Sequence, residues 1–277
     1  MTGSGTAVHL TRRRDLRQTS SVRALLLRAL VLAALVALHA APAAAQLEEV
    51  PPPPEPTLAS LPVLDPSYRP SNERSWSARL IAPVTPRSLP GAGLLRRPLK
   101  PWVPGTGNPV ELMILERRAA ANGEPWLKVL LPTRPNRSRG WIPEAATIVR
   151  RNSVRVVISL RKHRLTIFRE GKKVHQVGVA LGAPATPTPK GLFAVYQEVR
   201  EPGFSPLGPW AIHLTAHSDV LFEYAGGPGR VAIHGARGAL WAQAGTNPSH
   251  GCIRVPDPGI GRVAALLRPG TPVAIRP

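Results

Sequence analysis

The sequence predicts a mainly β protein built from two small domains. Apolar residues occur in short runs, and these are separated by turn-forming segments that hold many of the chain's 33 prolines and 24 glycines. From residue 153 onward the runs lengthen and alternate between apolar and polar residues, as half-buried strands do. A chain of 277 residues with 43% hydrophobic and 5% aromatic residues fills two modest cores more readily than one large core.

Residues 1–45 have the layout of a secretory signal peptide. Arginines at positions 12, 13, 14, 17 and 23 precede an apolar run at residues 29–38, and Ala43-Ala44-Ala45 supplies small residues before Gln46. This order is typical of a leader that is removed after export. We therefore expect an exported protein of the periplasm or cell wall, held at a membrane only if the leader is not cleaved. Residues 11–16 also resemble a twin-arginine signal, which leaves two export routes open.

Residues 46–72 form a proline-rich segment. Consecutive prolines at positions 51–54 are followed by further prolines at positions 56, 62, 66 and 70. This composition favours an extended polyproline II conformation over a packed fold. The prediction is a spacer between the leader and the folded domains.

Residues 73–150 are expected to form a small all-β domain. Short apolar runs at residues 78–82 and 110–115 are followed by breaks rich in Gly, Pro and Asn. The second half, from Trp126 through Gly140-Trp141-Ile142, resembles the bacterial SH3-like modules. Such a module implies wall binding or substrate positioning, and a plain spacer with a tryptophan-containing core is the alternative.

Residues 153–277 are expected to form the second domain. Runs at residues 154–160 and 164–169 predict antiparallel strands, and the Glu170-Gly171-Lys172 turn leads into a third. Residues 200–229 are rich in Gly and Pro and predict a long loop or lid with a strand beginning at Trp210 inside it. A short helix at residues 259–267 and a closing strand at residues 271–275 complete the expected order.

His234 and Cys252 are the candidate catalytic pair. Cys252 is the only cysteine, so it cannot form an intramolecular disulfide and is either buried or reactive. His234 ends one apolar run and Cys252 begins another, which would place both at the ends of neighbouring strands. An imidazole that accepts the thiol proton yields the nucleophilic thiolate. Gly251 allows a tight turn before the sulfur, and the backbone N–H groups of Gly251 and Cys252 are candidate oxyanion donors.

His234 followed by Ser249-His250-Gly251-Cys252-Ile253-Arg254 resembles the signature of the L,D-transpeptidase family (YkuD-like catalytic domain). A second match is the Pro187-Thr188-Pro189-Lys190-Gly191 stretch, about 60 residues before the cysteine. The resemblance covers roughly residues 153–277. It implies a catalytic domain of the β-sandwich or β-roll type that this family has.

The resemblance also implies a role for each residue of the site. Cys252 would be the acylated nucleophile, and His234 the proton donor and acceptor, oriented by the backbone carbonyl of Gly235. His250 and Gly251 would shape the acyl-donor site. The expected substrate-binding residues are Ser249, Trp210 and Arg254, the last at a position where many members have asparagine.

The activity implied is that of a peptidoglycan L,D-transpeptidase, a cysteine-dependent acyltransferase of cell-wall biogenesis and remodelling that needs no cofactor or metal. Cys252 would attack an L,D-peptide bond in a stem peptide with a diamino acid, and a second stem's amine would capture the thioester. Water as acceptor would give an L,D-carboxypeptidase, and a lipoprotein lysine an anchoring transferase. A carbapenem would acylate the same thiol. The alternative outside enzymes is a non-catalytic wall-binding protein.

Other chemistries fit these residues less well. His234, His250 and Cys252 are zinc-ligand types, yet a closed zinc site needs a fourth ligand and a hydrolytic one needs a nearby acidic base, for which only Asp257 is close in sequence. A serine hydrolase would need a Gly-x-Ser-x-Gly turn, which Ser249 lacks. A cysteine peptidase acting on proteins would need an Asn or Asp partner for the histidine.

The net charge is +20, and residues 46–277 still carry 30 basic against 15 acidic side chains. Such a charge attracts any polyanion, including the anionic polymers of a cell wall. The sequence has no basic helix, metal finger or aromatic-interleaved basic strand, so nucleic acid is not expected as a partner. Stem peptides are the expected partner.

Overall fold

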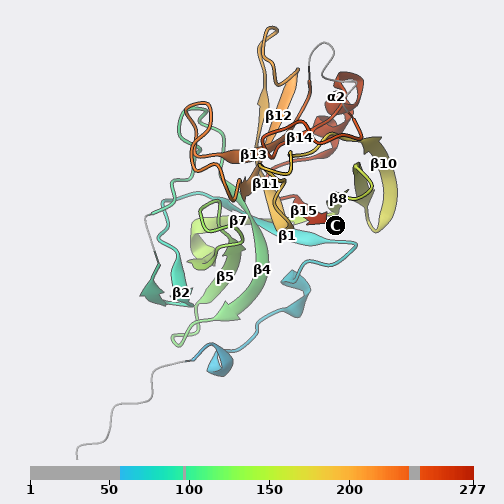
Figure 1. Cartoon of the computed structure of the whole chain (residues 1–277). Helices are drawn as coiled ribbons and strands as arrows, with labels where there is room; N and C mark the ends of the chain where they lie inside the picture. Colours follow the sequence, from blue (N-terminus) through green and yellow to red (C-terminus); the bar gives the residue numbers. More distant parts are fainter. Residues whose placement is uncertain (1–56, 96–97, 237–243) are drawn as a thin grey trace, which may run out of the picture. The chain divides into compact units, whose positions relative to one another are not determined.

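Two β-sheets make up most of the part of the chain that the structure, a computed structural model, describes (Figure 1). The described residues are 57–95, 98–236 and 244–277. The expected signal peptide and residues 46–56 of the proline-rich segment lie outside them. The prediction of a mainly β protein is confirmed. No helix among the described residues is both long enough and apolar enough to cross a membrane.

The first sheet contains seven strands of the described residues in the order β3-β2-β6-β5-β4-β1-β7, and every pairing in it is antiparallel. Its core is apolar, with Ala78, Ile114, Leu127, Val129 and Ile142 fully buried. The strands are β1 (Ser75–Leu80), β2 (Arg87–Leu89), β3 (Ala92–Leu94), β4 (Glu111–Ala119), β5 (Pro125–Leu130), β6 (Arg139–Pro143) and β7 (Thr147–Asn152). The SH3-like nature of this sheet stays a prediction.

The second sheet contains eight strands of the described residues in the order β10-β9-β8-β15-β11-β12-β13-β14. Two pairings are parallel, β8 with β15 and β13 with β14. The strands are β8 (Val154–Ser159), β9 (Arg164–Arg169), β10 (Lys172–Gly178), β11 (Gly191–Arg200), β12 (Trp210–His217), β13 (Arg230–His234), β14 (Ile253–Arg254) and β15 (Pro272–Arg276).

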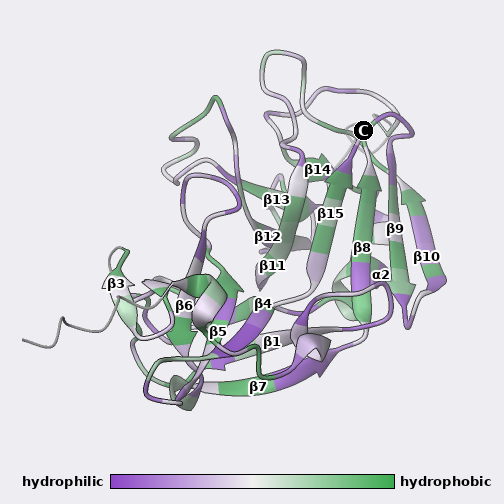
Figure 2. Ribbon diagram, turned by 90° about the horizontal axis from the view of Figure 1, so that it is seen from below, coloured by the Kyte–Doolittle hydropathy of each residue, from purple (hydrophilic) through white to green (hydrophobic). Residues whose placement is uncertain are grey.

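The core of the second sheet follows the period of its strands. Alternate residues of β8 and β9 are buried because successive side chains on a strand point to opposite faces, and β13 adds Val231 and Ile233 to the same core. Helix α2 (Asp257–Leu266) adds Ile260, Val263 and Ala264 to this core. Figure 2 shows mainly hydrophobic residues along β8, β13 and β15, whereas the edge strand β10 is more hydrophilic. This core fixes β13 and β14, the strands that carry the candidate site.

The segment expected to be a lid contains a central strand. β12 covers residues 210–217 and is paired on both sides, with β11 and with β13. Its residues Ile212, Leu214 and Ala216 are fully buried, which explains why the chain forms a strand here despite the Gly-rich and Pro-rich surroundings. Only the flanking segments, residues 201–209 and 218–229, are loops.

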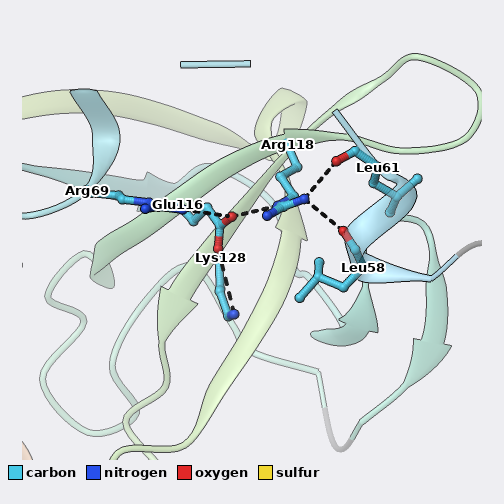
Figure 3. Close-up of polar contacts among 6 residues, drawn as sticks. All are labelled: Leu58, Leu61, Arg69, Glu116, Arg118 and Lys128. Carbon is cyan, nitrogen blue, oxygen red and sulfur yellow. Dashed lines mark hydrogen bonds and ion pairs between the residues drawn. The ribbon is translucent and has the colours of Figure 1, made fainter. Parts of the chain in front are cut away.

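Residues 57–72 are not the extended spacer that the proline content predicted. Two short 3-10 helices, Leu58–Ser60 and Pro66–Tyr68, lie against the first sheet. Arg118 donates to the carbonyl oxygens of Leu58 and Leu61 at 2.7 Å each and pairs with Glu116 at 2.6 Å (Figure 3). These contacts fix the segment because a half-buried arginine needs acceptors and the turning backbone supplies them.

The two sheets belong to one compact unit, residues 55–277. The first sheet ends at Asn152 and the second begins at Val154. A small apolar cluster joins them, in which Met113 and Leu130 of the first sheet pack against Ala194 of β11. Polar contacts support this interface, including the hydrogen bond from the Asn152 side chain to Thr271 Oγ1 at 3.0 Å.

Candidate active site

Parallel pairing of β13 with β14 brings the candidate base and nucleophile together. Ile233 lies opposite Ile253 and His234 opposite Arg254, so Cys252 falls beside Ala232. The backbone N–H of Ala232 donates to the Cys252 sulfur at 3.5 Å. The expectation that the two residues occupy neighbouring strand ends therefore agrees with the structure.

His234 is buried, and its ring is held by one strong contact. Nδ1 lies 2.5 Å from the carbonyl oxygen of Gly235. A carbonyl oxygen only accepts, so Nδ1 carries the proton and Nε2 is left as the acceptor. Burial lowers the pKa of His234 to about 4, opposed by the Gly235 hydrogen bond and assisted by the nearby charge of Arg254. At neutral pH His234 is therefore a neutral base.

The thiol of Cys252 is also neutral in this state. Burial raises its pKa above the ordinary value, and the Ala232 N–H and the charge of Arg254 lower it by less. Both shifts favour a thiol and a neutral imidazole over a thiolate and an imidazolium in the pair before substrate arrives. Proton transfer to His234 then has to accompany the attack on a substrate.

The turn before the sulfur is held from within by Ser249. Its hydroxyl donates to the Cys252 carbonyl at 2.6 Å and accepts the Gly251 N–H at 3.1 Å. Gly251 has φ of 109°, a conformation that L side chains rarely adopt, so the position requires glycine. This network fixes the direction in which the Cys252 side chain leaves the backbone.

The Pro-Thr-Pro loop supports the same turn from outside. Thr186 Oγ1 donates to the Ser249 carbonyl at 3.1 Å, and Thr188 Oγ1 accepts the Gly182 N–H at 2.9 Å. A Cβ on Gly182 would lie 2.9 Å from Gly251 Cα, so the two backbones can approach this closely only because position 182 is glycine. The two sequence motifs therefore form one structural unit around Cys252.

The family model that matches this sequence is the YkuD L,D-transpeptidase catalytic domain, over residues 153–275. This domain belongs to that family. The matched residues contain the second sheet up to residue 275, helix α2 and the His234–Cys252 site.

The similar proteins and structures that the comparisons found are L,D-transpeptidases. L,D-transpeptidase 1 of Mycobacterium tuberculosis is 32% identical over 109 residues, which are 36% of this chain and 42% of that protein. The chain thus spans less than half the length of this curated relative. An L,D-transpeptidase crystal structure from Mycobacterium tuberculosis H37Rv has a TM-score of 0.40 at 20% identity, covering 62% of this chain and 74% of that one.

Three residues predicted to shape the site or to bind substrate have structural contacts within this domain. Ser249 is buried, with its hydroxyl engaged inside the turn, so it is not available to a substrate. Gly251 gives its N–H to Ser249, so this N–H is not a free oxyanion donor in this conformation. Trp210 is half-buried and packs against the core of the second sheet, where its carbonyl accepts the Gly235 N–H at 3.3 Å.

The other predicted residues lie around the thiol. His250 is exposed, and its Nδ1 is 3.2 Å from the hydroxyl oxygen of Tyr224 in the 218–229 loop. The two rings are also in contact, tilted by 32° to each other at a centroid distance of 4.9 Å. Arg254 pairs with His234 across the two strands, and its charge opposes protonation of the imidazole.

Asp257 is a site residue that the sequence analysis considered only as a zinc-site base. Its Oδ1 accepts the Ala236 N–H at 2.7 Å, next to the Gly235 carbonyl that orients His234. A Cβ on Gly235 would lie 2.5 Å from that same oxygen and 3.0 Å from Gly208 Cα. Asp257 therefore positions the histidine through the backbone. An aspartate in the first turn of a helix was the available signal.

The described residues contain no group of three or more His, Cys, Asp and Glu side chains arranged to hold a metal ion. His250 is turned toward Tyr224, and His234 Nδ1 is taken up by a backbone carbonyl. The geometry around Cys252 is that of a nucleophile with a neutral base, supported by hydrogen bonds to backbone.

Proposed function

We propose that this protein is a peptidoglycan L,D-transpeptidase that forms crosslinks through a thioester on Cys252. The observation that carries the proposal is the fixed tautomer of His234, whose protonated Nδ1 faces the Gly235 carbonyl at 2.5 Å. That tautomer leaves Nε2 unprotonated on a strand neighbouring the only thiol of the chain. The family of the domain supports the same chemistry.

The proposed reaction has two stages. In the first, the Cys252 sulfur attacks the carbonyl of an L,D-peptide bond and its proton passes to His234. A carbon–sulfur bond forms, the C–N bond breaks, and His234 returns the proton to the departing D-amino acid. In the second, the amine of another stem peptide attacks the thioester, loses a proton to His234 and frees the thiol.

The oxyanion of the tetrahedral intermediate needs donors. Since Gly251 N–H is engaged by Ser249, the backbone N–H of Cys252 is the remaining candidate of the two named from the sequence. The charge of Arg254, which already acts on both His234 and Cys252, would favour negative charge at this place.

Export belongs to the proposal because crosslinked stem peptides lie outside the cytoplasmic membrane. The basic, apolar and small-residue order of residues 1–45 supports it. The excess of basic side chains after residue 45 would hold the protein near anionic wall polymers. A noncatalytic wall-binding role is the competing proposal.

The test is intact-protein mass spectrometry of the mature protein after incubation with a carbapenem, and separately with a tetrapeptide stem. We expect one covalent adduct per chain that is absent from Cys252→Ser, together with release of a D-amino acid. A crosslinked dimer would identify an amine acceptor, and a tripeptide would identify water. A folded protein that forms no adduct with either compound would refute acyl transfer and favour wall binding.

A further inference from the structure

A second site is suggested by a cavity of about 680 Å³ between the two sheets. The first sheet's side of it includes Leu99, Pro132 and Thr133, and the second sheet's side includes His217 and Arg230. Its walls are therefore partly apolar, with a few polar groups. Small-molecule sites in proteins have this composition and this range of volume.

Two buried polar atoms of the lining residues have no hydrogen-bond partner among the described residues. They are Thr133 Oγ1 and His217 Nδ1. His217 is only 3% exposed, and burial lowers its pKa to about 4, so its ring is neutral. Buried polar groups in folded proteins are nearly always hydrogen-bonded, and two of the six exceptions among the described residues belong to residues that line this cavity.

Arg230 brings a positive charge to the same cavity. Its terminal nitrogens donate to the carbonyl oxygens of Leu214 at 2.9 Å and Pro132 at 3.0 Å, and its guanidinium lies 4.4 Å from the centroid of the Tyr196 ring. The ion pairs found among the described residues do not include Arg230. A guanidinium has five N–H donors, so several remain for a ligand.

The cavity lies along the strand that carries the candidate base. Val231 and Ile233 face the core of the second sheet, so Arg230 and His234 project from the opposite face of β13. The two positions are four residue steps apart along the strand, which is roughly 13 Å. His213 of β12 interacts electrostatically with both residues. Burial lowers the pKa of His213 and that of His234, and the charge of Arg230 adds to the first shift as His213 adds to the second.

We propose that this cavity binds a carboxylate of the stem peptide, with Arg230 as the counter-ion and with Thr133 and His217 as hydrogen-bonding partners. A guanidinium matches a carboxylate in bidentate geometry. The apolar walls favour an anion attached to a carbon skeleton over a free inorganic anion. The stem peptide as the source rests on the proposed function. The first sheet would then help to bind substrate.

The test measures binding in the Cys252→Ser protein, where no thioester forms on sulfur. Isothermal titration calorimetry compares a tetrapeptide stem with free carboxylates against the same peptide with every carboxylate amidated. We expect the free peptide to bind at least about tenfold more tightly, and Arg230→Met to remove that preference, as loss of a charged hydrogen bond predicts. Arg155→Met is the matched control, since Arg155 also stacks on a ring, that of Phe168, and lines a different cavity.

Three results would overturn the proposal. The first is equal affinity for the free and the amidated peptide, and the second is an affinity for the free peptide that Arg230→Met leaves unchanged. The third is no binding of either peptide, which would mean that the cavity holds water only. If melting shows that Arg230→Met is unfolded, Thr133→Val takes its place and should weaken binding of the free peptide several-fold. Because Cys252 is absent from the assay, failure here is separate from failure of adduct formation in the wild-type protein.

Discussion

Asp257 should control the reactivity of a thiol that it does not touch. Its Oδ1 accepts the Ala236 N–H at 2.7 Å, and the adjacent Gly235 carbonyl fixes His234 Nδ1 at 2.5 Å. Asp257→Ala removes a charge-assisted hydrogen bond and leaves the Ala236 N–H without this acceptor. The expected loss is about 2 kcal/mol in the free energy of unfolding, the usual scale for a hydrogen bond to a charged group.

The same change should slow acylation. When the Gly235–Ala236 turn relaxes, the imidazole loses its fixed orientation, and a displacement of about 1 Å in a catalytic group costs on the order of 100-fold in rate. The assay is the rate of carbapenem adduct formation, followed by mass spectrometry, beside chemical denaturation. Asp257→Asn keeps an acceptor oxygen and should recover most of both quantities.

Two outcomes would refute this reasoning. If Asp257→Ala acylates at the wild-type rate while it loses stability, the turn does not position His234, and Asp257 has only a structural role. If neither quantity changes, the hydrogen bond to Ala236 contributes nothing measurable.

Three further predictions follow from the contacts described. Arg118→Ala should lower the free energy of unfolding by about 3 kcal/mol and expose residues 57–72 to limited proteolysis, because two carbonyls and a carboxylate lose their donor; equal proteolysis of both proteins would contradict it. Gly208→Ala should lower the free energy of unfolding, measured by chemical denaturation, by about 3 kcal/mol, since its φ is 72° and a Cβ would lie 2.7 Å from Gly235 Cα. Gly105→Ala is the control and should lower it by about 1 kcal/mol, since its φ is 86° but a Cβ would meet no atom within 4 Å. The rate of Cys252 acylation should be independent of pH from about 5 to 8. It should fall only as His234 is protonated near its pKa of about 4, because the protonated ring cannot accept the thiol proton. A fall in the rate centred near the ordinary histidine pKa of 6.5 would argue against a buried neutral base.

The strands of the second sheet could be predicted because their pattern is local. Alternation over residues 154–160 and 164–169 corresponds to β8 and β9, and the helix expected at residues 259–267 is α2 within two residues at its start. Cys252 and His234 could be singled out because their residue types and flanking motifs are rare together. Each of these inferences needed only neighbouring residues.

What could not be predicted depends on contacts between distant segments. Nothing near Ser249 in sequence shows that the Thr186 hydroxyl donates to its carbonyl, and Asp257 lies beside the His234 turn only because of the path of the chain between them. The proline content of residues 57–72 favours an extended chain. The hydrogen bonds from the Arg118 side chain on β4 to two backbone carbonyls hold this segment in turns instead. The cavity beside Arg230 exists only because two sheets meet.

The protonated state of Cys252 at rest has a consequence for the lifetime of the enzyme. Thiolates attack peroxides and disulfides far faster than thiols do, so a sulfur whose pKa is raised by burial reacts slowly with both. Since the chain has no second cysteine, no internal thiol could resolve an oxidised Cys252. Keeping the proton on sulfur until a substrate carbonyl arrives therefore protects the residue from oxidative damage between turnovers.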